Sequence, residues 1–535
     1  MKKMHLIYIV IFSFVTTYKS YYSYDTFDKN NVPVYDGVMN ENRQIRSYIR
    51  YKNNFSLIER FNQVIYEFEG NNLSAGFSCF IAFVCPSWFI NDGDLLVRSF
   101  VAVLLFSLVL FNFLKNRTNS FNTLLIITLL FQLPLFYHFR YGLTTYVPEI
   151  PAALFLLSGY LQILNFFKSE KTIHFMLGCL FMVLAIMFRF NFFVYAAFFI
   201  LPLLYRCFRI FLQKKRSEII VLLGFIVLTL SFLAFYIFSH LDFFLGYYIK
   251  DIPYALISLR SSFSGMMADF KMEISVIGVL ALFVVLILVN ENKLEKRKVE
   301  ILYLLYPFAF FFSFIILYLN ATNVPHIMAA FVVFLLASFL VPSALFTKIY
   351  STLKQRYVRL FAFLLIIVLN VNYVFSCISF SKTLPEQLGH RKVIDYMANE
   401  KNLSPTYKYI CFYDESVEVQ IDVALFKKTG VWLNSLNHFD VHDLYMAAIS
   451  PELNSSVCTK HYMNMIDSVK FDLVIINKEP NTPLSGFKTA KETNIKVERF
   501  METNQDYEIE KIIRTSYHGK LLLFKRRVKN ENVSK

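Results

Sequence analysis

Charged side chains are scarce in this chain. Asp, Glu, Lys and Arg make up only 17% of the 535 residues, whereas 56% of the residues are apolar. Soluble globular domains contain about 25% charged residues, so the composition excludes an ordinary water-soluble protein. The seven cysteines are too few for a disulfide-rich scaffold, and no C-x-x-C spacing typical of a zinc site occurs.

Several motifs that would indicate other functions are also missing. No Gly-rich phosphate loop is present, which argues against a nucleotide-binding domain. The apolar run from Leu6 to Val15 is not followed by a small-x-small cleavage site, which favours an uncleaved membrane anchor over a signal peptide. The net charge is +15, but much of the excess lies between apolar runs, where it meets anionic lipid. We therefore expect no nucleic-acid partner.

Long apolar runs are what the chain has in abundance. They are about 17–25 residues long, enough to cross a bilayer core of roughly 30 Å as helices, and in lipid a helix satisfies all of its own backbone hydrogen bonds. The pattern predicts about eleven transmembrane helices, at residues 4–18, 95–114, 121–138, 149–167, 173–188, 192–209, 218–238, 273–290, 299–319, 326–346 and 358–378.

The basic residues predict the orientation of these helices. Nineteen Lys and Arg residues fall in one alternating set of breaks, among them Lys115, Lys171 and Lys214, and only five fall in the short breaks of the other set. Cytoplasmic loops carry the excess of basic residues. The amino terminus is therefore expected in the cytoplasm, and residues 19–94, 239–272 and those after about 379 outside it.

The predicted fold class is an α-helical polytopic membrane protein with a carboxy-terminal extracytoplasmic α/β domain. Its expected parts are a membrane anchor (1–18), a large extracytoplasmic first loop with amphipathic surface helices (19–94), a helical bundle (95–378) and the α/β domain (379–535). In the last part, His390–Asn399 has a helical pattern, and Tyr409–Tyr413, Phe471–Ile476 and Lys520–Phe524 resemble strands.

Ionisable residues on the predicted outer face are candidates for chemistry. The first loop carries several carboxylates that are either a solvated acidic surface or a general base or metal ligand. Glu149 opens a span, where a carboxylate also suits the helix dipole. Cations and polar groups share this face, so the set resembles a site for an anionic lipid-phosphate substrate. The first-loop candidates are Asp25, Asp28, Asp36 and Glu69, and the others are Arg140, Glu149, Arg189, Asn191 and His326.

The overall plan resembles the GT-C class of integral-membrane glycosyltransferases, in particular the bacterial lipid-A aminoarabinose transferase and protein O-mannosyltransferase group. The resemblance lies in an acidic first outer loop with Asp36, a Gly/acid/Arg turn from Asn91 to Arg98, and Glu149 with Pro151. Arg189-Phe-Asn191 and the stretch from Asn323 to Met328 with His326 also match loosely. The Asp-Glu or Asp-Asp pair usual in the family's first loop is absent, since Gly37 follows Asp36.

The resemblance implies a function and roles for these residues. Such enzymes move a sugar from a polyprenyl-phosphate carrier to a lipid, glycan or protein acceptor outside the bacterial inner membrane, with inversion at the anomeric carbon. Asp36, Asp28 or Asp25 would be the catalytic base. Glu149, Arg140, Arg189, Asn191, His326 and Glu69 would bind substrate. The resemblance identifies no certain cofactor and leaves open a divalent cation beside the phosphate.

Three alternatives stay open, one of which is a non-enzymatic membrane scaffold. A transporter or lipid flippase predicts charges near the middle of the membrane and repeated halves, whereas the sequence shows few such charges and no repeated halves. A cell-surface polysaccharide polymerase or ligase usually carries its large loop late in the chain, whereas here the long outer segments come first and last.

Overall fold

The computed structural model describes residues 3–28, 93–115, 118–137, 142–144, 149–188, 192–200, 204–239, 355–383, 389–400, 403–412, 417–433, 455–478, 488–515 and 519–527, together with six single positions. These residues are mostly helical. The chain divides into two compact units. The second contains Asp25–Ile45 and the chain from Ser376 onward, close to the predicted boundary at 379. Each unit is described by itself.

The first unit is a bundle of apolar helices. Four of them are long and apolar enough to cross a membrane, with their spans at Leu95–Leu114, Glu149–Phe167, Arg216–Ala234 and Arg356–Phe375. The described helices of this unit are α1 (Lys3–Asp28), α5 (Gly93–Leu114), α6 (Ser120–Leu130), η2 (Pro134–Tyr137), α7 (Glu149–Ser169), α8 (Thr172–Phe188), α9 (Phe192–Ile200), α10 (Leu204–Leu212), α11 (Arg216–Ser239) and α16 (Gln355–Thr383).

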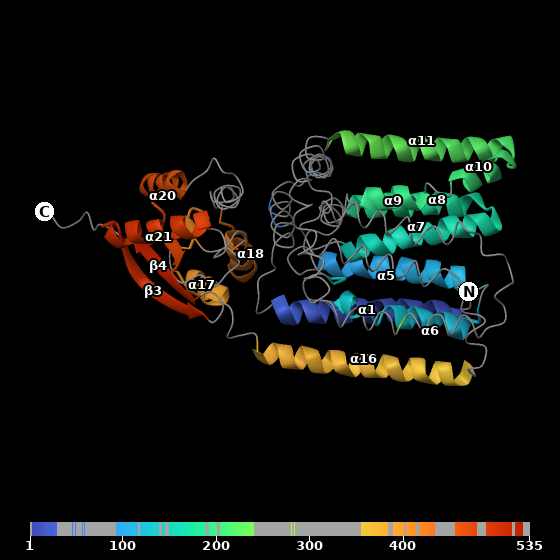
Figure 1. Cartoon of the computed structure of the whole chain (residues 1–535), viewed down its shortest axis with the longest axis horizontal. Coiled ribbons are helices and arrows are strands. Elements are labelled where there is room, and N and C mark those ends of the chain that lie inside the picture. Colours follow the sequence, from blue (N-terminus) through green and yellow to red (C-terminus); the bar gives the residue numbers. More distant parts are fainter. Residues whose placement is uncertain are drawn as a thin grey trace. The chain divides into compact units, whose positions relative to one another are not determined.

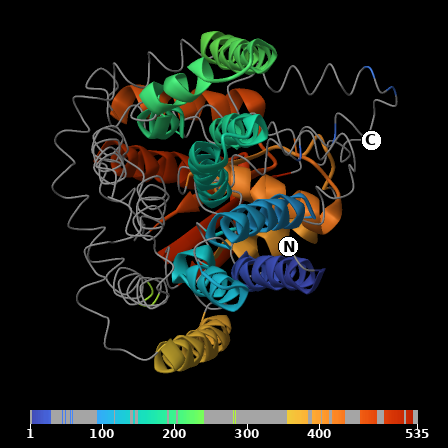
Figure 2. The ribbon, with the colours of Figure 1, turned by 90° about the vertical axis from the view of Figure 1, so that its right-hand side faces the viewer.

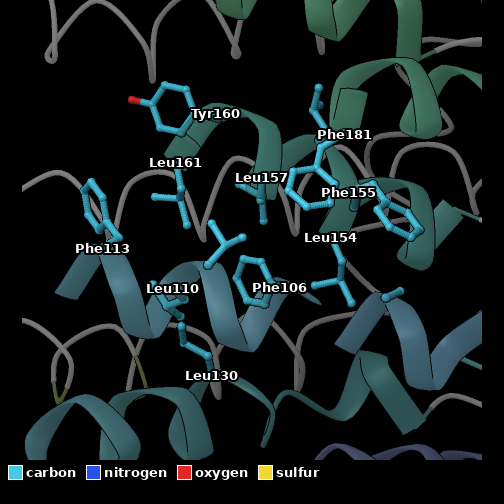
Figure 3. Packing of buried hydrophobic residues seen from close by; sticks show 14 of the residues in the cluster. Phe106, Leu110, Phe113, Leu130, Leu154, Phe155, Leu157, Tyr160, Leu161 and Phe181 are labelled. Carbon is cyan, nitrogen blue, oxygen red and sulfur yellow. The ribbon is translucent and has the colours of Figure 1, made fainter. Parts of the chain in front are cut away.

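Helix α7 is the centre of the bundle. Its span is 94% buried, and it packs between α5 and α8 (Figures 1 and 2). Large side chains from the three helices fill the space between them (Figure 3), with Phe106 on α5, Phe155 on α7 and Phe181 on α8 among them. The Phe155 ring lies with its centroid 6.3 Å from that of Phe181 and 5.2 Å from that of Phe188.

Two glycines bring α7 and α8 into close contact. A Cβ atom built on Gly159 would lie 2.9 Å from the backbone oxygen of Gly178, and one on Gly178 would lie 2.6 Å from Cδ1 of Ile163. Small residues at a helix interface allow the two backbones to approach closely. In a membrane, the hydrophobic effect does not drive helices together, so association depends on such close packing.

The outer helices expose apolar surface. Only 6% of the α11 span and 11% of the α16 span are buried. Helix α1 is two-sided: Ile9, Ser13 and Thr16 are buried, whereas Ile11 and Phe14 on its other side are 58% and 63% exposed. Apolar faces of this extent are costly in water and suit contact with lipid chains.

The described helices match the predicted spans unevenly. The spans at 95–114, 149–167, 218–238 and 358–378 coincide with α5, α7, α11 and α16, so the described residues contain four candidate spans of the about eleven predicted for the chain. The span at 4–18 lies within α1, which continues to Asp28. The span at 173–188 is α8, and 192–209 contains α9 and the start of α10. The spans at 273–290, 299–319 and 326–346 lie outside the described elements.

The prediction of a single continuous helix at 121–138 was wrong. Helix α6 ends at Leu130, and a separate short 3-10 helix begins at Pro134. Proline lacks a backbone N–H and disfavours helical geometry in the residue before it, so the α-helix cannot run through this point. The break positions the following residues, which carry part of the candidate site.

The direction of the helices gathers basic residues at one end of the bundle. Figure 1 shows α1, α11 and α16 ending on the side where α5 and α7 begin. At the opposite end, the His5 ring of α1 lies 5.4 Å from that of Phe111 on α5, and Nε of Arg359 on α16 donates to Oδ1 of Asn122, 2.8 Å away. Lys115, Lys171, Arg216 and Arg359 belong to the predicted cytoplasmic set, and the helix directions bring them to this end.

The second unit is built on a four-stranded sheet with strand order β1-β2-β4-β3. Strand β1 (Tyr409–Phe412) pairs in parallel with β2 (Leu473–Asn477), with Cys411 opposite Ile475. Strand β4 (Gly519–Arg526) runs antiparallel to both β2 and β3 (Tyr507–Thr515). The helices are α17 (Gly389–Ala398), α18 (Val417–Thr429), α20 (Ser455–Val469) and α21 (Lys488–Thr503).

Alternating side chains of the sheet pack into two hydrophobic cores, one on each face. Leu473, Ile475 and Leu523 pack with α17 and α18, whereas Val474 and Phe524 pack with α20 and α21 on the other face. The predicted helix at His390–Asn399 and the predicted strands near 409, 471 and 520 are confirmed, and β3 was not predicted. The unit is a three-layer α/β/α arrangement (Figure 1).

Candidate functional site

Buried polar side chains collect at the end of the bundle opposite the basic end. Ser20 on α1, Ser99 on α5 and Thr144 in the segment before α7 are 2%, 0% and 0% exposed. Arg98 on α5 and Glu149 at the first position of α7 are each 2% exposed. An apolar bundle gains nothing by burying such groups unless they have partners or a function.

Hydrogen bonds tie the segment between η2 and α7 to α1. The Ser20 hydroxyl donates to the Phe136 oxygen at 2.8 Å and accepts from the Thr144 hydroxyl at 3.0 Å and from the Thr144 backbone N–H at 3.3 Å. The Ser23 hydroxyl donates to the Tyr137 oxygen, 2.8 Å away. These bonds hold the segment between η2 and α7 against the last turns of α1.

Helix α5 is joined to the same segment. The Ser99 hydroxyl donates to the backbone oxygen of Leu143 at 2.5 Å. Arg98 therefore lies next to the residue that anchors α5 here. Since α5 packs along α7, the guanidinium of Arg98 and the carboxylate of Glu149 are buried at the same end of two neighbouring helices. Both side chains take part in further polar interactions.

Lys19 on α1 adds a positive charge beside this segment. Nζ of Lys19 donates to Oδ1 of Asn370 at 2.8 Å and lies 3.8 Å and 4.4 Å from the ring centroids of Tyr137 and Tyr373. The Tyr373 hydroxyl donates to the backbone oxygen of Lys19 at 2.6 Å. Aromatic faces stabilise an ammonium when water is partly excluded, so this charge is held in place between α1, η2 and α16.

Three of the nine predicted site residues lie among the described ones. Asp25 and Asp28 occupy the last turn of α1, and Asp25 is half-buried. Glu149 is the first residue of α7 and is buried. Within the first unit, Ser20 and Ser23 of α1 bond to the segment that precedes α7, so α1 as far as Tyr24 shares this end of the bundle with Glu149. The others, Asp36, Glu69, Arg140, Arg189, Asn191 and His326, lie outside the described residues.

Sequence reasoning missed Lys19, Ser20 and Thr144. A signal for Ser20 was present, because Ser13, Thr16 and Ser20 recur at helical spacing and mark a polar stripe on an otherwise apolar helix. Thr144 gives no such signal, since its role depends on the turn that folds it back onto α1. Arg98 was noted only as part of the turn that heads the second span.

Metal ligands are not gathered within the part of the chain that the structure describes. No group of three or more His, Cys, Asp or Glu residues there could hold a metal ion. The described site instead combines a buried carboxylate with two fixed cations and several hydroxyls. Lysine and arginine are side chains that bind phosphate, and a carboxylate can orient a hydroxyl.

Comparison with known proteins gives no family for this chain: it matches no family model and no curated protein.

Proposed function

We propose that the protein is a membrane glycosyltransferase of the GT-C kind, which moves a sugar from a polyprenyl-phosphate donor to a lipid, glycan or protein acceptor. The observation that carries the proposal is the buried polar end of the bundle, where Arg98, Glu149 and Lys19 lie among hydroxyls at the end opposite the basic residues. By the rule that basic loops stay inside, this end is extracytoplasmic in a bacterial inner membrane.

The donor suits such a bundle. Its prenyl chain matches the exposed apolar faces of α11 and α16, and its phosphate matches the cations at the polar end. A nucleotide sugar would offer no apolar chain for these faces. Arg98 and Lys19 would bind the phosphate, together with Arg140, Arg189 and His326. Glu149, Asn191 and Glu69 would orient the sugar and the acceptor.

The transfer is a single inverting displacement. A first-loop carboxylate, Asp36, Asp28 or Asp25, takes the proton from the acceptor hydroxyl. The oxygen attacks the anomeric carbon, and the bond from that carbon to the phosphate oxygen breaks. The electron pair leaves with the phosphate, so the products are the glycosylated acceptor and polyprenyl phosphate. Positive charge near the leaving oxygens stabilises the charge that develops there.

The position of the charges disfavours a transporter or lipid flippase. Such proteins carry substrate sites near the middle of the membrane on discontinuous helices. Glu149 lies instead at the start of α7, Arg98 lies within two turns of the start of α5, and Lys19 lies nine residues before the end of α1. A polysaccharide polymerase would use the same donor chemistry and differs only in its acceptor.

The test is a transfer assay with a matched control. The purified protein in nanodiscs receives polyprenyl-phosphate sugars and a crude envelope acceptor, and released polyprenyl phosphate is measured. Glu149→Gln should lower turnover at least about tenfold, since it removes a charge-assisted hydrogen bond. Glu218→Gln is the control, because Glu218 also lies in the first turn of its helix but is 43% exposed. No release with any donor would overturn the proposal.

A further inference from the structure

A groove of about 870 Å³ lies between α17 and β3 in the second unit. Strand β3 is an edge of the sheet, so its outer side carries no neighbouring strand among the described elements. The lining includes Lys392, Asp395, Tyr396, Asn399, Glu400 and Lys511. This volume is in the range of sites that bind small molecules.

A β-bulge turns one of these side chains into position. Ile509 pairs with Phe524 of β4, and Lys511 pairs with the adjacent Leu523, so Glu510 is an extra residue. Phe524 and Leu523 face opposite sides of the sheet. Without the bulge Lys511 would share the face of Ile509. With it, Lys511 faces α17, and its Nζ lies 5.2 Å from the ring centroid of Tyr396. Bulges often re-aim a side chain at functional sites.

The charges of the groove are unevenly compensated. Asp395 pairs with Lys428 at 2.5 Å, and Glu400 pairs with Lys525 at 2.9 Å. Neither lysine belongs to the lining. The lining cations Lys392, Lys511 and Arg514 have no carboxylate partner among the described residues. The groove therefore offers uncompensated positive charge beside two carboxylates that keep lone pairs for hydroxyl donors.

We propose that this groove binds an acidic saccharide, one that carries a carboxylate or a phosphate. The anionic group would pair with Lys392 and Lys511, the sugar hydroxyls would donate to Asp395 and Glu400, and the C–H face of a ring would lie on Tyr396. A neutral sugar leaves the cations unused. A ligand with negative charge and no hydroxyls would be repelled by the carboxylates of Asp395 and Glu400. That the saccharide is the acceptor of transfer rests on the proposed function, whereas its binding does not.

The experiment measures binding by the full-length protein in nanodiscs of zwitterionic lipid, without any sugar donor. The probes for titration calorimetry are trigalacturonate, glucose 6-phosphate, inorganic phosphate and maltotriose. One or both acidic saccharides should bind, more tightly than phosphate, and maltotriose should not. The calorimetric affinity for the acidic saccharide should fall as salt rises. Lys511→Gln and Lys392→Gln should each weaken it about tenfold, as expected for loss of one charge-assisted hydrogen bond.

Lys460→Gln is the matched control, because Lys460 is an exposed lysine on α20, which covers the other face of the sheet. Equal binding of maltotriose, or wild-type affinity in both groove variants, would overturn the proposal. Another outcome is that the protein binds separately added, empty nanodiscs of anionic lipid and no saccharide. If that binding is lost in the same variants, the groove binds a membrane surface and not a saccharide. If the protein binds acidic saccharide but transfers no sugar, the proposal for the groove holds and the proposed function is wrong.

Discussion

The contact between α7 and α8 allows a sharp test of the bundle. We predict that Gly159→Ala destabilises the protein, because the new methyl group would lie 2.8 Å from Cγ of Met182 and 2.9 Å from the backbone oxygen of Gly178. The methionine side chain can move, but the backbone oxygen cannot move unless the helices separate. Overpacking of this kind costs about 1–3 kcal/mol.

The control corrects for the intrinsic effect of alanine. Replacing a helical glycine by alanine stabilises a helix by roughly 1 kcal/mol, and this gain applies at any interior helical position. Gly224 on α11 has no heavy atom within 4 Å of the Cβ position. Gly224→Ala should therefore keep the gain, and the difference in unfolding free energy between the two variants should be about 1–3 kcal/mol.

The assay is thermal unfolding in detergent, followed by loss of the monodisperse peak in size-exclusion chromatography. Gly159→Ala should melt several degrees below Gly224→Ala. Gly159→Leu should fail to give a monodisperse protein, since three more carbons must fit the same space. A Gly159→Ala variant that melts with Gly224→Ala, or above it, would refute the close packing of α7 and α8.

Three further predictions concern orientation and the second unit. A cysteine introduced at the exposed Lys460 of a chain otherwise free of cysteine should react with a membrane-impermeant reagent on intact cells, and labelling only after lysis would reverse the orientation. Burial lowers the pKa of Lys525, but the hydrogen bond and charge of Glu400 and the charge of Glu510 outweigh it and raise that pKa above 10.5. This pair should therefore stabilise the unit below pH 10.5 and lose its contribution as the pH rises through the raised pKa. In urea unfolding at increasing pH, the unfolding free energy of Glu400→Gln should depend less on pH than that of the wild type. Residues 379–535 expressed alone should be soluble, folded by circular dichroism and inactive in transfer, and an isolated tail with its own activity would overturn the division of roles.

Much of the fold was predictable where one physical constraint dominates. The runs that became α5, α7, α11 and α16 leave the backbone no alternative to a helix in lipid. Strand β3 escaped prediction because Glu508, Glu510 and Lys511 obscure the alternation, and the bulge at Glu510 shifts its phase. The break before Pro134 could have been read from the sequence, but an apolar run on both sides outweighed it.

The candidate site was less accessible to sequence reasoning. Glu149 was identified because a carboxylate at the edge of an apolar run is conspicuous. Lys19 was taken as a residue just beyond the anchor, yet its ammonium is held by Asn370, more than 300 positions away in the chain. Contacts of that separation depend on the packing of α1 against α16, which no local pattern encodes.

The placement of the acidic residues on α1 distinguishes function from structure. Asp25 and Asp28 lie in the last turn of the helix, which contains no basic residue. The carboxyl end of a helix carries partial negative charge, so a carboxylate there costs about 0.3–1 kcal/mol. Glu149, at the start of α7, is favoured by the same effect. The helix dipole thus favours the carboxylate of Glu149 and disfavours those of the two aspartates.

This argument predicts opposite effects on stability and on activity. Asp25→Asn and Asp28→Asn each remove a charge that the helix dipole disfavours, so the dipole by itself predicts no fall in the melting temperature. If one of them is the catalytic base, its turnover in the transfer assay should fall about 10²–10⁴-fold. Asp36→Asn completes the set, because Asp36 is the third candidate. Lower turnover with an equal loss of stability would indicate a structural role. Full activity of all three variants would show that none of these aspartates is the catalytic base.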